Sequence, residues 1–236
     1  MNPTTLSRLL DLNRQFYQTF AIPFSATRSR LQPGVLRILE QINSSDSLLD
    51  LGCGNGELAH HLARNGHAGT YTGLDFSSVL LEQAAAGQPP HFRFLQVDLS
   101  SPTWDASLAG CRPDIILAFA VLHHLPGEEL RRQVLRKVRS LLTPGGRFIH
   151  SEWQFLNSPR LKARVQPWEA IGLSQHEVDP GDYLLDWRQG GQGLRYAHHF
   201  SEAELEDLAA KTGFGIAETF LSDGENHRLG LYQVWK

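Results

Sequence analysis

The stretch that decides the fold is residues 48–56, which read LLDLGCGNG. Its leucines form the short apolar run of a buried central strand, and Asp50 sits near the carboxyl end of that run. Gly52, Gly54 and Gly56 follow at alternate positions, and ELAHHLAR then restores helical spacing. The stretch predicts a strand, a glycine turn and a helix. A ligand could lie against the bare backbone of the turn, beside the unpaired N–H groups at the helix start.

The spacing of the glycines argues against a dinucleotide site. Such a site needs G-x-G-x-x-G, whereas this turn reads G-x-G-x-G behind an acid. A glycine turn in some other α/β protein is the alternative interpretation of this stretch by itself.

Composition bounds the class of protein. The chain has 236 residues, of which 41% are hydrophobic and 20% charged, as expected for one large α/β domain. Its 2 cysteines form no disulfide framework, no His or Cys pairs have zinc spacing, and the amino-terminus lacks a signal-peptide core. We therefore expect a cytoplasmic protein with no metal and no membrane segment. A net charge of −3 argues mildly against nucleic-acid binding by charge alone, although residues 1–40 are locally basic.

The amino-terminal segment predicts an amphipathic helix over residues 4–20, then a loop broken by Pro23 and Pro33, then a helix over 34–42. The first helix either packs on the main domain or forms a cap over the ligand; the same residues serve both interpretations. The loop places Arg28 on an irregular segment, and loops often carry function.

Acids and histidines end the other predicted strands. Asp75 follows the glycine turn at the interval typical of an acid that accepts hydrogen bonds from a ribose, or it is a surface acid that caps the next helix. Asp98 ends a third predicted strand. It is either a site residue or an exposed loop acid. His123 and His124 follow a strand over 115–119, at the edge where open α/β sheets hold their sites. Each is a candidate for substrate contact or base chemistry, or else a structural residue.

The remaining chain predicts a helix over 128–142 whose cations are a solvated face. Residues 154–197 are interrupted by prolines and a GGQG run, which indicates a substrate-side insertion or lid. Ser201 and Glu204 then predict a capping box at the start of a helix, and two last strands close the sheet.

Five stretches resemble, in order, the motifs of the class I S-adenosylmethionine (SAM) methyltransferases: LLDLGCGNG, TGLDFS, VDL, PDIILAFAVLHHL and LLTPGG. The resemblance implies a Rossmann-like, doubly wound α/β sheet of seven strands, with SAM as cofactor and S-adenosylhomocysteine as product. It implies an Asp98 bond to the adenine amino group and a Leu99 contact with the ring. The implied cofactor contacts are Asp50, Gly52, Cys53, Gly54, Gly56, Asp75, Phe76, Asp98, Leu99 and Ala120.

The expected organisation is a single methyltransferase domain over residues 1–236. Residues 1–45 are the helical cap, 46–151 the SAM-binding core, 152–199 the substrate-side insertion, and 200–236 the last helix and β-hairpin.

Flanking stretches are similar to a narrower family, the tRNA wobble-uridine carboxymethyl methyltransferases. FSATR at 24–28, AVLHHL, GDYLLDW at 181–187 and RYAHHFSEAELEDL at 195–208 carry this similarity. These enzymes esterify the carboxylate of 5-carboxymethyluridine, so tRNA and a small activator protein are the implied partners. The chain departs from the family where Ala197 follows Tyr196 and where His227, rather than Trp, follows Asn226.

The implied chemistry places different demands on the site residues. A carboxylate acceptor, with an unperturbed pKa of roughly 4, is already ionised at neutral pH and needs no general base. It needs cations that direct one carboxylate oxygen at the methyl group, a task suited to Arg28 and Arg195. The alternative interpretation is that these two arginines form surface salt bridges. His123, His124, Tyr196 and His198 are then candidates to frame the base or phosphate, and His227 is a further candidate for substrate binding.

Two other functions stay open. A small-molecule O- or N-methyltransferase would rely more on His123 or His124 as a base. A non-catalytic SAM-binding module is the third hypothesis.

Overall fold

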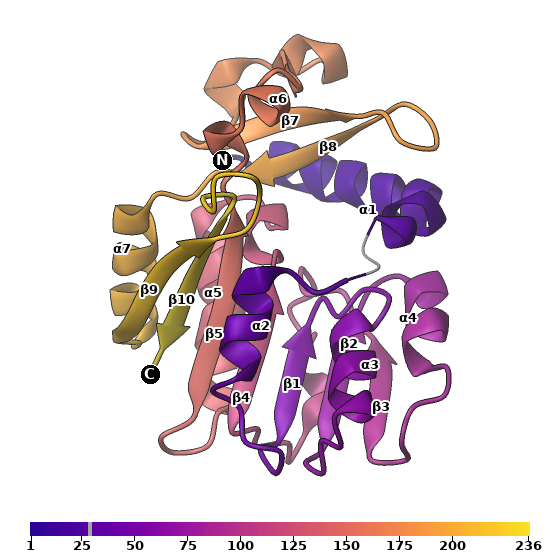
Figure 1. Cartoon of the computed structure of the whole chain (residues 1–236). Coiled ribbons are helices and arrows are strands. Elements are labelled where there is room, and N and C mark those ends of the chain that lie inside the picture. The colour runs from indigo at the N-terminus through magenta and orange to yellow at the C-terminus, as the bar shows by residue number, and fades with distance from the viewer. Residues whose placement is uncertain (28–29) are drawn as a thin grey trace.

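The computed structural model describes residues 1–27 and 30–236; Arg28 therefore lies outside the described residues. Its main sheet has seven strands in the order β3-β2-β1-β4-β5-β10-β9, with β10 antiparallel to both neighbours (Figure 1). The predicted Rossmann-like sheet is confirmed. The chain order reverses between β1 and β4, and open α/β sheets bind ligands outside the carboxyl ends of the strands at such a point. The strands are β1 (Leu48–Leu51), β2 (Tyr71–Asp75), β3 (Phe92–Gln96), β4 (Ile115–Phe119), β5 (Arg147–Trp153), β9 (Ile216–Ser222) and β10 (Gly230–Trp235).

Helices cover both faces of this sheet, so its central strands are apolar on both sides. Leu49 and Ile116 pack with α5 (Glu128–Leu141) and α7 (Glu202–Thr212) on one face. Leu48 and Ile115 pack with α2 (Pro33–Leu39) and α3 (Glu57–Arg64) on the other. A further helix, α4 (Ser78–Ala85), lies beside β3. Alternate residues of β1 and β4 thus point to opposite cores.

The first helix is longer than the sequence predicts. α1 spans Pro3–Ala26, so the loop expected from residue 21 is wrong as far as Ala26. Pro23 lies inside the helix and has no N–H to donate, and Phe20 has non-helical angles of φ −108° and ψ 16°. A missing N–H kinks a helix without necessarily ending it. The kinked end carries its aromatic side chains onward over the sheet edge.

The segment 154–197 contains a second, antiparallel sheet, β6-β7-β8, that the sequence analysis did not predict. It comprises β6 (Val165–Gln166), β7 (Asp182–Trp187) and β8 (Gly193–His198), preceded by the short helix α6 (Pro159–Lys162). The side chain of Asn13 in α1 accepts the N–H of Tyr196 at 2.9 Å and donates to its C=O at 3.2 Å. α1 and this sheet therefore form one layer above the carboxyl edge of the main sheet (Figure 1).

The predicted capping box of α7 is half formed. Ser201 Oγ accepts the N–H of Glu204 at 3.1 Å, as expected. The Glu204 carboxylate does not return to the cap; it contacts His198 and Arg131 instead. The ion pairs of Glu204 with His198 and Arg131 take the place of the hydrogen bond that would complete the capping box. Within residues 1–27 and 30–236 no helix is both long and apolar enough to cross a membrane.

Candidate active site

The glycine turn after β1 has the backbone that the sequence predicts. Gly52, Gly54 and Gly56 have φ of +68°, +55° and +76°, in the left-handed region that favours glycine. A Cβ on Gly52 would lie 2.7 Å from Val121, and one on Gly56 would lie 2.6 Å from the Ala84 backbone. A Cβ on Gly54 would meet nothing within 4 Å. Gly54 therefore presents its backbone to open space, where a ligand can approach closely.

Asp75 lies beside this turn, and its carboxylate can accept further hydrogen bonds. Its two carboxylate oxygens accept the N–H groups of Gly54 at 3.0 Å and Ser77 at 2.9 Å. Burial raises the pKa of Asp75, against the lowering effect of these hydrogen bonds. Each oxygen keeps a second lone pair, so the carboxylate can still take two hydroxyl donors. This geometry fits a ribose.

Asp98, expected at the adenine, is already occupied. Its Oδ2 accepts two bonds from Arg14 of α1, at 3.0 Å from Nε and 2.7 Å from Nη2. Its Oδ1 accepts the Ser100 N–H at 2.9 Å and hydroxyl at 2.6 Å. Burial raises the pKa of Asp98, but the bonds from Ser100 and Arg14 outweigh burial and hold it below its usual range. An adenine amino group would have to displace Arg14; the neighbouring Leu99 is half-buried and packs on the core.

Asp50 and Cys53 lie beneath the turn rather than on its open side. Tyr71 donates its hydroxyl to Asp50 at 2.6 Å, and burial raises the pKa of this carboxyl to about 7. Burial also raises the pKa of the Cys53 thiol, whose sulfur would lie 2.8 Å from a Cβ on Gly73. The two side chains support the turn from below.

We expect the unfolding free energy of the Asp50→Asn variant to increase, relative to that of the unmodified protein, as pH rises. The pKa of Asp50 is near its ordinary value of 3.8 in the unfolded chain but about 7 in the folded protein, so the folded state binds more protons between these values. Stability therefore falls as pH rises through that window, and Asn removes this fall. Between about pH 5 and about pH 8 the difference in unfolding free energy should move toward the variant by roughly 2–3 kcal/mol. Urea unfolding measures this; a difference independent of pH would contradict the assignment.

Ala120 marks a strained point at the carboxyl end of β4. Its φ is +58°, uncommon for a residue with a Cβ, and its N–H donates to Ser151 O at 2.9 Å and Oγ at 3.1 Å. Such strain clusters at functional sites. The turn that follows carries His123 and His124.

Three polar side chains come together where α1, β8 and this turn meet: Tyr17, His124 and Arg195. The Tyr17 hydroxyl lies 2.7 Å from His124 Nε2 and 3.5 Å from Nη1 of Arg195. Tyr17 also packs edge-on against Phe76, which follows β2. Asn13 donates to the His124 carbonyl at 3.2 Å and so ties the turn to α1.

Arg195 is the unusual member of this group of side chains. It is 6% exposed, and its guanidinium lies 4.7 Å from the ring centre of Trp153, 5.4 Å from Phe16 and 5.6 Å from Trp187. We call these three rings the aromatic cage. Within the described chain Arg195 has no ion-pair partner, and its buried Nε has no hydrogen-bond partner. Buried charges in proteins are normally paired, so the cage is suited to an anion supplied by a ligand.

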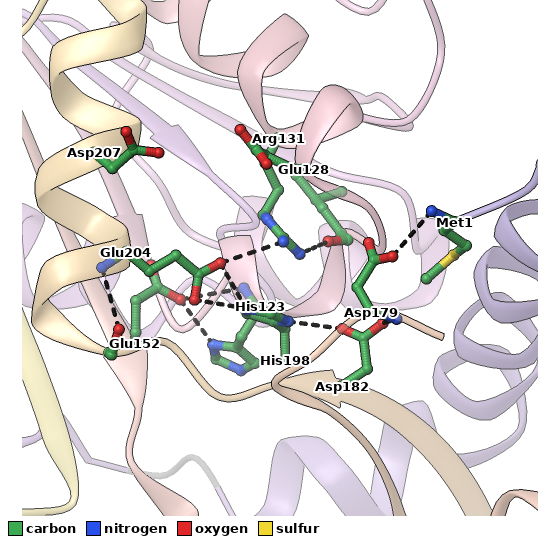
Figure 2. A network of polar contacts seen from close by, with 12 residues as sticks. Met1, His123, Glu128, Arg131, Glu152, Asp179, Asp182, His198, Glu204 and Asp207 are labelled. Atoms are coloured by element: carbon green, nitrogen blue, oxygen red, sulfur yellow. Dashed lines mark hydrogen bonds and ion pairs between the residues drawn. The ribbon is translucent and has the colours of Figure 1, made fainter. Parts of the chain in front are cut away.

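His198, expected near Arg195, faces the other way. Tyr196 and His198 alternate with Arg195 along β8, and both donate to Asp182 at 2.7 Å. Figure 2 shows His198 between the carboxylates of Asp182 and Glu204, with Arg131 beyond. Burial lowers the pKa of His198, but Asp182 and Glu204 outweigh burial and raise it above its ordinary value. The structure therefore gives Tyr196 and His198 structural partners away from the aromatic cage.

His123 packs against the cage, with its ring centre 6.2 Å from that of Trp153 and 4.2 Å from that of His124, whereas His227 lies on a separate loop. His123 is 1% exposed, and its ring and N–H each lie 3.1 Å from Glu152. His227 is exposed on the loop 223–229, with a φ of +55°. Of the predicted catalytic residues that the structure describes, Arg195 and His124 both contact the Tyr17 hydroxyl, and His123 packs behind His124. Nothing in the sequence marks Tyr17 or Arg14 as site residues, because both are ordinary members of an amphipathic helix pattern.

This fold and glycine turn define a class of protein, the doubly wound ligand-binding domains with a site at the switch point. More specifically, the chain belongs to the methyltransferase domain family, whose model matches residues 24–219. It is a SAM-dependent methyltransferase. The glycine turn, Asp75 and the strained Ala120 fit that cofactor.

Known proteins resemble this chain to different extents. A putative methyltransferase of Encephalitozoon cuniculi is 29% identical over 86% of this chain and 87% of its own length. The mouse tRNA (carboxymethyluridine(34)-5-O)-methyltransferase ALKBH8 is 31% identical over 59% of this chain, which spans only 19% of that protein. The 27-O-demethylrifamycin SV methyltransferase of Amycolatopsis mediterranei is 32% identical over 72% of this chain and 57% of its own length.

A solved structure confirms the fold over the full chain. The Burkholderia thailandensis 1,6-didemethyltoxoflavin-N1-methyltransferase, with S-adenosylhomocysteine bound, superposes with a TM-score of 0.67 at 20% identity. The alignment covers 100% of this chain and 90% of that one.

Proposed function

We propose that the enzyme transfers a methyl group to a carboxylate, and that the carboxylate belongs to a 5-carboxymethyl wobble uridine in tRNA. The observation that carries the proposal is Arg195, a buried guanidinium without an acid partner among the described residues. Its planar fork matches a carboxylate in two-bonded geometry. Trp153, the one ring of the aromatic cage that is half-buried rather than buried, could stack on a nucleobase, since bases stack on aromatic side chains.

In this proposal each residue binds or orients the cofactor or the acceptor, and no general base is needed. SAM supplies an electrophilic methyl group, which the glycine turn and Asp75 would hold at the switch point. Arg195 holds the acceptor carboxylate, and the Tyr17 hydroxyl, fixed by His124 at 2.7 Å, adds a hydrogen-bonding group on the same side. Arg28 remains a second proposed cation. In-line displacement demands alignment above all, and this arrangement supplies it by orientation.

The choice of tRNA rests on sequence. The FSATR and RYAHH stretches resemble the wobble-uridine enzymes, and one relative of that activity is 31% identical over 59% of this chain. Because the chain spans 19% of that relative, the activity of the whole relative is carried over only as part of this proposal. The small activator protein stays a prediction. A small-molecule carboxylate is the competing acceptor.

We expect methyl-labelled SAM to label tRNA that contains carboxymethyluridine, and mild alkali to release the label as methanol. An ester is alkali-labile, whereas a methyl group on carbon, nitrogen or ribose is not. A small-metabolite extract is the parallel acceptor, and Arg195→Met is the inactive control. Alkali-resistant label would contradict the carboxylate mechanism, and label only in the metabolite pool would contradict the tRNA substrate.

A further inference from the structure

The segment 154–167 carries Arg160, Lys162 and Arg164 and no acid, in a chain whose net charge is −3. Arg160 and Lys162 are exposed and Arg164 is half-buried. A fourth cation, Arg228, joins them from the loop 223–229, since its carbonyl accepts the Asn157 side chain at 2.9 Å. We call these four residues the α6 basic surface.

The four cations lack the partners that other surface cations have. Across the described residues none of their side chains forms an ion pair or a hydrogen bond. On α5, by contrast, Arg132 and Arg136 each lie 3.5 Å from Glu129, and Arg139 donates to the Gly213 carbonyl at 3.1 Å. Glu225, near Arg228 in sequence, forms no ion pair within the described part of the chain. The charge of the α6 basic surface is therefore uncompensated.

This surface is linked to the aromatic cage by a hydrophobic cluster. Leu161 of α6 packs inward with Phe155 and with Ala197, two residues from Arg195 on the same face of β8. Trp153 and Leu229 pack against that cluster, and Trp153 is the ring closest to the Arg195 guanidinium, at 4.7 Å. With Leu161 directed inward, Arg160 and Lys162 are left exposed, and Asn157, just before α6, is hydrogen-bonded to Arg228 and Asn226 of the loop 223–229.

We propose that the α6 basic surface binds the phosphate backbone of the tRNA whose modified uridine enters the aromatic cage. This rests on the proposed function and names how the same site holds its polyanionic substrate. An acidic protein cannot rely on its overall field to bind RNA, so a local set of unpaired cations is needed. Phosphate contacts supply affinity and position the substrate without reading its sequence.

The test compares two triple variants of equal charge change. R160Q/K162Q/R164Q removes three cations of the α6 basic surface, and R132Q/R136Q/R139Q removes the α5 cations whose partners are already supplied by the protein. Fluorescence anisotropy of labelled tRNA across a salt series measures affinity. We expect the first variant to bind tRNA at least about tenfold more weakly near 0.1 M salt, with a log–log salt slope lower by about two. The α5 variant should bind as the unmodified protein does.

A second readout separates this surface from the proposed chemistry. Free 5-carboxymethyluridine nucleoside has no phosphate, so both triple variants should esterify it as the unmodified protein does. Equal loss of tRNA affinity in the two variants, or no loss in the first, would contradict the proposal that the α6 basic surface binds tRNA. Absence of ester on any acceptor would contradict the proposed function, while tRNA affinity lost only in the first variant would still support the surface.

Discussion

Arg195→Met will lower kcat/KM for the carboxylate acceptor by about 30- to 5,000-fold, because truncating one partner of a buried charge pair removes about 2–5 kcal/mol. The same change should leave the free energy of unfolding within about 1 kcal/mol. Within the described chain the guanidinium has no acid partner, so its removal leaves no buried carboxylate unpaired. A methionine of similar length also keeps contact with the rings. Labelled methyl transfer and urea unfolding measure the two effects.

Arg131→Met is the matched control, since Arg131 is also buried, at 2% exposure. It donates to the Leu125 carbonyl at 3.0 Å and pairs with Glu204 at 3.4 Å (Figure 2). Removing a paired arginine leaves buried acceptors unsatisfied and should destabilise by about 3–5 kcal/mol. If Arg195→Met destabilised as strongly as Arg131→Met, or stayed fully active, the assignment of Arg195 to an acceptor anion would be wrong.

Gly54→Ala will weaken SAM binding by about 5- to 150-fold, the effect of about 1–3 kcal/mol of steric overlap with a ligand against the backbone. Its Cβ meets no protein atom within 4 Å, so the stability loss should be limited to the strain of φ +55°, about 1–2 kcal/mol. Calorimetric titration with SAM and thermal unfolding without it separate the two quantities.

Two other glycines serve as controls for this substitution. Gly66→Ala imposes the same strain at φ +72°, also with open space around it, and should leave SAM affinity unchanged. Gly56→Ala adds a 2.6 Å approach to the Ala84 backbone and should destabilise by about 2–5 kcal/mol through strain and overpacking. Equal loss of SAM affinity in the Gly54 and Gly66 variants would show that strain alone explains the effect.

The sequence by itself determined the framework of the site. A short apolar run, an acid and alternating glycines predict β1, its turn and α3, because chain-local sterics decide which residues adopt a positive φ. The regular order of strands and helices placed Asp75, Asp98 and His124 at one edge, since parallel strands share their carboxyl ends. These predictions needed no knowledge of distant contacts.

Tertiary structure alone decided which side chains meet. Tyr17 and Arg195 are 178 residues apart in sequence, and Arg14 reaches Asp98 across 84 residues. Residues 182–187 and 193–198 form strands that place Arg195 on one face and His198 on the other, and a one-residue change of register would exchange them. Such pairings depend on how α1 and the second sheet pack over the edge, through contacts that have no local pattern. A helix pattern shows that Tyr17 is amphipathic, but only packing shows what its hydroxyl touches.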